Sequence, residues 1–285
     1  MKKVFKIFAW TVLVLVLALF ALMATFLYKV KNGFPVSYET DKPALAIPAD
    51  KSAILLFSKT TGFRHAESIQ ASIPALKNLE EKNNWFIYGT EDGGVFNSEQ
   101  LKKFKLVVFN NSTGRVLNEE QQKALEDYVN QGGAIMGIHG AGDDSHHAWN
   151  WYTNEFLGAE FSHHPLDPQF QKAEVKMEAG VDSLFEKNLS KSWVNTDEWY
   201  VFFAQPKGAK VLYTINGDKI IPNGNILWTT YKNFGMGANH PVAWYREVGK
   251  GKTFYTSMGH SAAVWKNPDY LKLIEQGIAW SIQKN

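Results

Sequence analysis

The chain has 285 residues, of which 30 are Lys or Arg, 28 are Asp or Glu, eight are His and none is Cys. Five of the lysines lie within the first 31 residues, so the remaining chain has 25 basic and 28 acidic residues and a net charge of −3. That part has no basic run and no nucleic-acid-binding motif, so nucleic acid is not an expected partner. The lack of cysteine excludes disulfides and cysteine nucleophiles, and it is compatible with export without requiring it.

An apolar segment stands at the start of the chain. The 22 residues from Ile7 to Tyr28 are uncharged, and as a helix they would span about 33 Å. This run is longer than the apolar region of a cleaved signal peptide, and no typical cleavage site follows it. We interpret residues 1–31 as a single-pass membrane anchor, with a cleaved signal peptide as the alternative. Three lysines precede the run and two follow it, which favours a cytoplasmic N-terminus and a body exported to the periplasm or outside the cell.

The rest of the chain divides into a short linker and one large body. Residues 32–50 carry three prolines and no hydrophobic periodicity, which predicts an extended tether. Residues 51–285 are enough for one large domain with a sizeable core. Short apolar runs alternate there with helical patterns. This alternation predicts an α/β fold of three layers, with helices on both faces of a mostly parallel sheet and a more β-rich half after about residue 160.

The individual elements follow from apolar runs and from capping residues. Strands are predicted at residues 53–57, 85–90, 106–110 and 134–138, and later at 173–177, 210–215, 241–248 and 253–258. A helix is predicted at residues 66–82, with a kink or restart at Pro74. Another follows its expected cap Asn118 and ends at Gln131, and the last begins after Asn267 with Pro268 at its first position.

Most of the histidines stand at strand ends or in turns, namely His65, His139, His163, His164, His240 and His260. Ligands of open α/β sheets bind outside the carboxyl ends of the strands, so we expect His65, His139 and His260 to converge there. Imidazole transfers protons near neutral pH and is the commonest metal ligand. The pattern therefore predicts a histidine-lined pocket. The other two, His146 and His147, stand in a polar loop that we interpret as solvated.

The turn at His139 is the sharpest local signal. Gly137, Gly140 and Ala141 surround His139 just after a predicted strand. Small neighbours allow a tight turn that pushes the central side chain into the open, as in a nucleophile elbow. The alternative is a histidine that only bonds to the backbone of its turn.

Six motifs in one order resemble the ThuA-like (trehalose-utilisation) family. They are Phe63-Arg-His65, Gly137-Ile-His-Gly-Ala141, Phe161-Ser-His-His-Pro165, Asp197-Glu-Trp-Tyr200, His240-Pro-Val-Ala-Trp244 and Gly251-Lys-Thr-Phe-Tyr-Thr-Ser-Met-Gly-His260. The resemblance covers about residues 52–283 and implies a fold similar to class I glutamine amidotransferases. It also implies carbohydrate catabolism, with a glycoside or 3-keto-glycoside as substrate and sugar oxidoreductases of the same pathway as partners. Amidotransferases use a cysteine nucleophile where this chain has His139, which excludes that mechanism.

The residues and the resemblance together give a set of candidate site residues. The expected catalytic residues are His65, His139, His164 and Glu198, and the expected substrate-binding residues are Arg64, Trp199, Tyr200, His240, Trp244 and His260. In the alternative interpretation Glu198 is, with Asp197, an exposed charge at a turn, and His163 is a packing residue. Aromatic side chains suit the C–H faces of sugars, and the candidates are Trp149, Trp151, Trp199, Tyr200, Trp244 and Trp265, of which we expect two to contact a ligand.

Cofactor motifs of fixed spacing are absent from the sequence. A mixed site that includes His65, His139 and His260 would suit zinc or another first-row divalent ion, and this remains one alternative. The segments Gly93-Gly94 and Gly235-Met-Gly237 match neither a phosphate-binding loop nor a dinucleotide-binding loop. A nicotinamide cofactor is therefore not expected.

The sequence therefore predicts a membrane-anchored ThuA-like protein that acts on a glycoside or 3-keto-glycoside. The expected chemistry is acid–base hydrolysis, elimination or isomerisation, with a divalent metal as an optional participant. The alternative from another class is a non-catalytic sugar-binding or sensing module.

The first prediction concerns the apolar segment. Wild-type protein should stay in the membrane fraction after a carbonate wash, because the uncharged run is long enough to cross the hydrocarbon core. Deletion of residues 1–31 should release the protein into the soluble fraction. Recovery of intact wild-type chain in the carbonate supernatant, or a mature N-terminus beyond residue 31, would identify a signal peptide instead.

Overall fold

The computed structural model describes residues 2–32, 36–146, 149–222, 224–226, 229–231 and 237–283. It divides into two units, Met1–Ser37 and Tyr38–Asn285, and each is described by itself.

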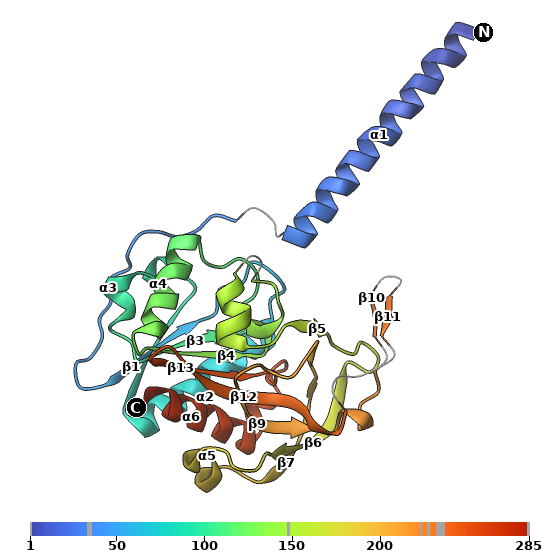
Figure 1. Cartoon of the computed structure of the whole chain (residues 1–285). Helices are drawn as coiled ribbons and strands as arrows, with labels where there is room; N and C mark the ends of the chain where they lie inside the picture. Colours follow the sequence, from blue (N-terminus) through green and yellow to red (C-terminus); the bar gives the residue numbers. More distant parts are fainter. Residues whose placement is uncertain are drawn as a thin grey trace. The chain divides into compact units, whose positions relative to one another are not determined.

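The first unit is a single helix, α1 (Lys2–Asn32), so the predicted apolar run is helical throughout (Figure 1). Within the described residues, Lys2–Lys29 is the one stretch of helix long and apolar enough to cross a membrane, judged by length and composition. Its apolar side chains, such as Phe8 and Leu19, are exposed. A helix satisfies its backbone hydrogen bonds internally, which is what a hydrocarbon environment requires.

The second unit is built on a nine-stranded sheet in the order β2-β1-β3-β4-β13-β12-β9-β6-β7 (Figure 1). Five strands are parallel: β1 (Ser52–Phe57), β2 (Trp85–Thr90), β3 (Leu106–Asn110), β4 (Ala134–Ile138) and β13 (Gly251–Thr256). The other four extend the sheet in antiparallel fashion: β12 (His240–Val248), β9 (Lys210–Ile215), β6 (Phe170–Met177) and β7 (Ser192–Glu198). The predicted α/β class with a largely parallel sheet and a β-rich second half is confirmed.

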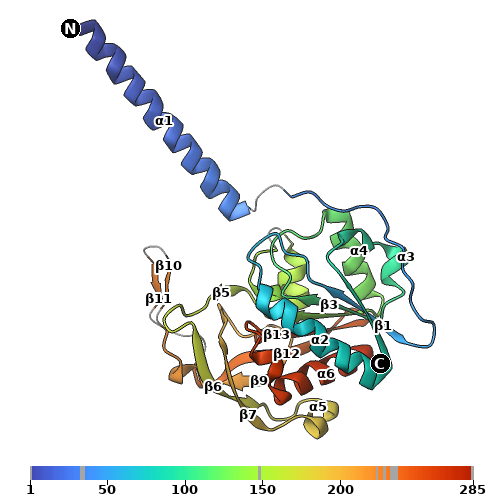
Figure 2. The ribbon, with the colours of Figure 1, turned by 180° about the vertical axis from the view of Figure 1, so that it is seen from behind.

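Helices cover both faces of the parallel half. Helices α2 (Ala66–Asn83) and α6 (Pro268–Ile282) lie on one face, and α3 (Ser98–Leu101) and α4 (Glu119–Asn130) lie on the other (Figures 1 and 2). The alternation of side chains along each strand produces two cores. On β1, Ile54 and Leu56 join the core under α2 and α6, whereas Leu55 and Phe57 join the core under α3 and α4.

Capping residues fix the ends of the helices as the sequence predicts. Asn118 and Gln121 form a capping box at the start of α4, and the Asn267 side chain accepts a hydrogen bond from the Asp269 N–H at the start of α6. Helix α2 continues through Pro74, so the restart that was one of the two predicted outcomes does not occur. Packing against β1 and β2 stabilises it despite the missing N–H.

The predicted tether also differs from the structure. Residues 38–50 form no helix or strand, but they belong to the second unit and pack on it. Leu45 and Ile47 contact the core under α3 and α4, and Gln100 Nε2 donates a hydrogen bond to the Pro43 carbonyl at 2.5 Å. The folded unit therefore begins about a dozen residues earlier than the sequence indicates.

Smaller elements complete the unit. Strand β5 (Phe161–His163) pairs with β8 (Val201–Phe202), and β10 (Gly224–Ile226) pairs with β11 (Thr229–Tyr231). A short helix, α5 (Ser183–Asn188), contacts α6, and a π-helix spans Tyr152–Leu157.

Candidate functional site

Four polar residues from distant parts of the chain meet at the carboxyl ends of the parallel strands. His65 lies in the loop between β1 and α2, His139 directly follows β4, His260 follows β13, and Glu198 is the last residue of β7. One ligand atom of each lies within 4.8 Å of the others. We call this group the His–Glu cluster. The structure thus brings together the three histidines that the sequence places at this edge.

His139 is held in a constrained turn. Its φ of +45° lies in the left-handed region, which is costly for a residue with a Cβ, and Tyr255 Oη donates to its carbonyl oxygen at 2.8 Å. The prediction of an exposed side chain is wrong, because His139 is fully buried. Its Nδ1 lies 2.7 Å from the Ser257 carbonyl and therefore carries a hydrogen, and its Nε2 is directed at the His–Glu cluster.

The glycine after His139 makes room for another histidine. A Cβ on Gly140 would lie 2.9 Å from His65 Nδ1, closer than such atoms approach in proteins. Glycine here therefore permits the His65 ring to pack edge-on against the His139 ring, with ring centroids 4.7 Å apart.

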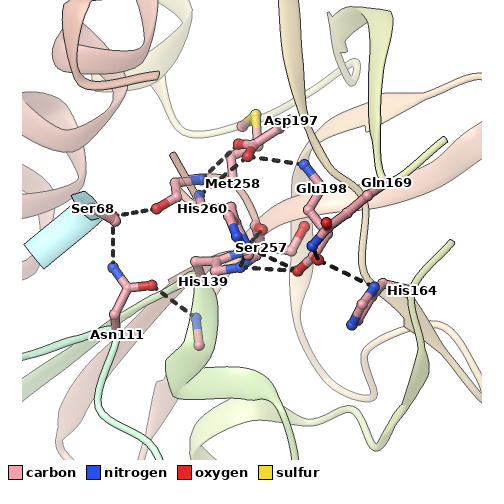
Figure 3. A network of polar contacts seen from close by, with 12 residues as sticks. Ser68, Asn111, His139, His164, Gln169, Asp197, Glu198, Ser257, Met258 and His260 are labelled. Carbon is pink, nitrogen blue, oxygen red and sulfur yellow. Dashed lines mark hydrogen bonds and ion pairs between the residues drawn. The ribbon is translucent and has the colours of Figure 1, made fainter. Parts of the chain in front are cut away.

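Glu198 divides its two oxygens between two sets of partners (Figure 3). Oε1 accepts from Gln169 Nε2 at 2.5 Å and lies 3.1 Å from His164 Nδ1. Oε2 lies 3.0 Å from His260 Nδ1 and 3.4 Å from His139 Nε2. Glu198 is 1% exposed, so its interpretation as an exposed charge is excluded.

The protonation of the cluster follows from this arrangement. Burial alone would raise the pKa of Glu198, but hydrogen bonds from His139 and His260 hold that pKa well below its usual range. Burial likewise opposes protonation of His139, yet the Glu198 carboxylate outweighs it and raises the pKa of His139. Burial lowers the pKa of His65 to about 2, with His139 and His260 adding to the effect, so His65 is neutral.

Asp197 holds the loop that carries His260. Its buried carboxylate accepts backbone hydrogen bonds from Gly259 at 2.7 Å, from His260 at 3.1 Å and from Glu198 at 3.0 Å (Figure 3). Burial raises the pKa of Asp197, because a charged carboxylate is poorly solvated there. Only its position next to Glu198 marks Asp197 in the sequence, and its role as an anchor depends on loops distant in the chain.

A cavity of about 250 Å³ opens onto the cluster. His65, His164, Glu198, Tyr200 and His260 line it, as do four residues that the sequence analysis did not select, namely Phe63, Asp143, Phe161 and Gln169. Burial raises the pKa of Asp143 to about 6, although hydrogen bonds from Ser145 act in the opposite direction. A carboxyl that titrates near neutral pH inside a cavity is a candidate for proton transfer. No local motif in the sequence indicates this shift.

Several expected substrate-binding residues do not line this cavity. Trp199, His240 and Trp244 are buried, and each places a ring nitrogen on a backbone carbonyl 2.7 to 2.8 Å away. Arg64 forms a 2.6 Å ion pair with Glu91 instead. Of the six aromatic candidates, Tyr200 alone lines this cavity within the described residues, and Phe63 and Phe161 supply the remaining aromatic surface.

The other histidines lie outside the cavity lining. His146 is 6% exposed, with Nε2 at 3.0 Å from the Ser112 carbonyl, so the interpretation as a solvated residue is wrong for His146. His147 lies outside the described residues. His163 is buried beside Ser162, as a packing residue would be.

The family model and the similar solved structures point to the same family. The ThuA family model, described as trehalose utilisation, matches residues 53–281. A ThuA-like protein from Bacteroides uniformis has a similar structure, with a TM-score of 0.67 and 22% identity over 89% of this chain and 97% of that chain. Another from Parabacteroides merdae has a TM-score of 0.63 and 18% identity over 82% of this chain and 90% of that chain. A cytoplasmic protein from Salmonella typhimurium has a TM-score of 0.53 and 14% identity over 81% of this chain and 100% of that chain.

None of the curated proteins compared with the chain matches it. The family match nevertheless spans most of the sequence, and the chain belongs to the ThuA family. Membership implies a carbohydrate-related role. At these identities the structural neighbours establish the fold alone.

The second prediction tests the anchor under His260. Asp197→Asn replaces one acceptor oxygen by an N–H donor, so at least one of the three backbone N–H groups loses its partner. We expect the free energy of unfolding to fall by about 1–3 kcal/mol, measured by urea denaturation. Asp127→Asn is the matched control, since it removes only an exposed ion pair with Lys123, and it should change stability by less than about 0.5 kcal/mol. Equal stability of the two variants would refute the anchoring role.

Proposed function

We propose that this protein is an enzyme of carbohydrate catabolism that cleaves a 3-keto-glycoside by acid–base elimination in the cavity beside the His–Glu cluster. The observation that carries the proposal is the pairing of His164 with the buried Glu198 in the lining of a cavity that also contains Asp143, a carboxyl whose pKa burial raises to about 6. The family's description as trehalose utilisation supports the substrate class.

His164 has the geometry of a general base. Its Nδ1 lies 3.1 Å from both Glu198 Oε1 and the Pro165 carbonyl oxygen, and both atoms are acceptors. Nδ1 therefore carries the hydrogen, and Nε2 keeps a lone pair that can take a proton. A carboxylate that orients an imidazole and stabilises its protonated form is the arrangement found in catalytic triads.

The proposed elimination requires one base and one acid and no other reactant. A keto group at C3 acidifies the C2–H bond, and His164 Nε2 removes that proton. The electrons of the C–H bond form a C1–C2 double bond, and the C1–O bond to the second sugar breaks. Protonated Asp143 gives its proton to the departing oxygen. Addition of water to the double bond would complete a net hydrolysis.

The shape and lining of the cavity fit one sugar ring. Its volume of about 250 Å³ lies below the range of about 300–1,000 Å³ for sites that hold drug-sized ligands. Phe63, Phe161 and Tyr200 offer aromatic surface for C–H groups, and Gln169 offers an amide for hydroxyls. No Ser, Thr or Cys lines the cavity within the described residues, so the lining favours proton transfer over a covalent hydroxyl or thiol intermediate.

The enolate formed after proton removal carries negative charge on the C3 oxygen. We place that oxygen toward His65 and His260, the members of the His–Glu cluster that share the cavity wall with Glu198. Positive charge held in the cluster would stabilise the enolate in a site with little water. A sugar oxidoreductase must supply the substrate, because the keto group arises by oxidation of a hydroxyl.

We also propose that α1 anchors the protein in the membrane with the second unit on the exported side. The support is the length and apolar composition of α1, together with the excess of lysine before its apolar run.

The third prediction concerns the base. His164→Gln should lower kcat for a 3-keto-glycoside by about 100- to 10,000-fold with a smaller change in KM, because the variant loses Nε2 but keeps a donor for Glu198. Product formation is followed by release of the second sugar. His163→Gln is the control, since this neighbouring histidine does not line the cavity, and it should retain more than about half of wild-type kcat.

Two results would contradict the enzymatic proposal. If His164→Gln turns over substrate at the wild-type rate, the base is misassigned. If wild-type protein binds keto-glycosides but converts none of them, the chain is a sugar-binding module.

The fourth prediction concerns the acid. Asp143 must be protonated to donate, so kcat limited by cleavage should decline as pH rises through about 6, where this carboxyl ionises. The nearby charge of His139 lowers the pKa of Asp143 and that of Asp144 raises it, while burial remains the largest cause of the shift. In Asp143→Asn the decline near pH 6 should vanish and kcat should fall at all pH values. A pH–rate profile identical to that of the wild type would refute the role of Asp143.

A further inference from the structure

We propose that the His–Glu cluster is a binding site for one divalent transition-metal ion, held by His65, His139, His260 and Glu198. The inference goes beyond the proposed function, because metal binding is measured without any substrate and can hold or fail by itself.

The distances within the cluster match those between ligands of one ion. His139 Nε2 lies 2.9 Å from His260 Nδ1, His260 Nδ1 lies 3.0 Å from Glu198 Oε2, and His139 Nε2 lies 3.4 Å from the same oxygen. Ligand atoms about 2.0–2.1 Å from a tetrahedral zinc ion are about 3.3 Å from one another. Three donor atoms from three elements thus form a triangle of the required size.

When His139 is neutral, hydrogen bonds cannot satisfy all three atoms of this triangle. Since His139 Nδ1 donates to Ser257, a neutral His139 has only a lone pair at Nε2. Glu198 Oε2 is also an acceptor, so the single hydrogen on neutral His260 Nδ1 faces two acceptors at once. A cation bound by all three atoms satisfies every lone pair.

His65 supplies the fourth donor. It is 6% exposed, and its Nδ1 is buried without a hydrogen-bond partner within the described part of the chain. A ring nitrogen of His65 nevertheless belongs to the group of atoms within 4.8 Å of one another. Ligation would give this buried ring the polar partner that it otherwise lacks, and Gly140 leaves the space for the ring in that position.

Three of the four ligand residues are themselves oriented by neighbouring hydrogen-bond partners, as the ligands of protein metal sites commonly are. The Ser257 carbonyl fixes the tautomer of His139, and Gln169 and His164 occupy Oε1 of Glu198 so that Oε2 faces the cluster. Asp197 fixes the backbone of His260. Such outer hydrogen bonds orient ligands and tune the bound ion.

The donor set also selects the kind of ion. Three imidazoles and one carboxylate suit zinc and its first-row neighbours, whereas calcium and magnesium prefer oxygen ligands. Glu198 cancels one of the two positive charges and leaves the site net positive. His65, Glu198 and His260 line the cavity, so a ligand there would have to supply a fifth donor atom for the ion to polarise a carbonyl oxygen.

The fifth prediction is tested with metal ions alone on the full chain in detergent, after removal of metal with a chelator. Zn²⁺ and Co²⁺ should each bind with a stoichiometry near one in calorimetric titration and should raise the melting temperature, while Mg²⁺ and Ca²⁺ should not. His260→Gln and Glu198→Gln should weaken Zn²⁺ binding by about 100-fold or more, and Gln169→Ala by about 10-fold.

His146→Gln is the matched control, because it removes a buried histidine outside the cluster, and it should bind Zn²⁺ like the wild type. X-ray absorption of the zinc-loaded wild type needs no variant and should show about three imidazole ligands. Absence of transition-metal binding, or equal Zn²⁺ affinity of His260→Gln and His146→Gln, would overturn the site. Stoichiometric metal binding without turnover of keto-glycosides would support the metal site and contradict the proposed function. Turnover by a protein that binds no transition metal would contradict the metal site and support the proposed function.

Discussion

The buried carboxylate of Glu198 imposes the strongest constraint on this fold. A buried charge costs several kcal/mol unless donors surround it, so both oxygens need partners in fixed positions. Gln169 and His164 contact Oε1 of Glu198, and His139 and His260 contact its Oε2. These partners come from the β5–β6 loop and from the turns after β4 and β13. The loops at this edge therefore fold around the Glu198 carboxylate. The Asp197 carboxylate stabilises the same loops by accepting hydrogen bonds from the backbone N–H groups of Gly259 and His260.

The two halves of the sheet make different contributions to the site. The parallel half delivers His65, His139 and His260, because the carboxyl ends of parallel strands share one edge. The antiparallel half adds strand β7, whose last residues contact the loop after β13 although β7 lies at the far edge of the sheet order. The parallel strands alone would bring the three histidines together without Glu198, so the antiparallel extension completes the His–Glu cluster.

The sequence predicts the local features of this protein better than it predicts contacts between segments that are distant in the chain. Strands such as residues 134–138 and the cap Asn118 follow from short patterns, and so does the position of His139 at a strand end. The burial of His139, Trp199 and Trp244 does not, because a buried ring bonded to a backbone carbonyl has the same local sequence as one that faces a ligand. Asp143 likewise titrates near neutral pH because of burial, and burial depends on segments distant in the chain.

Glu198 also links the two proposed activities of the site. Its Oε1 orients His164, and its Oε2 belongs to the His–Glu cluster. A cation bound at Oε2 withdraws negative charge from the carboxylate, which weakens the attraction between Oε1 and a protonated His164. The proposed metal site and the proposed base are therefore coupled through one carboxylate.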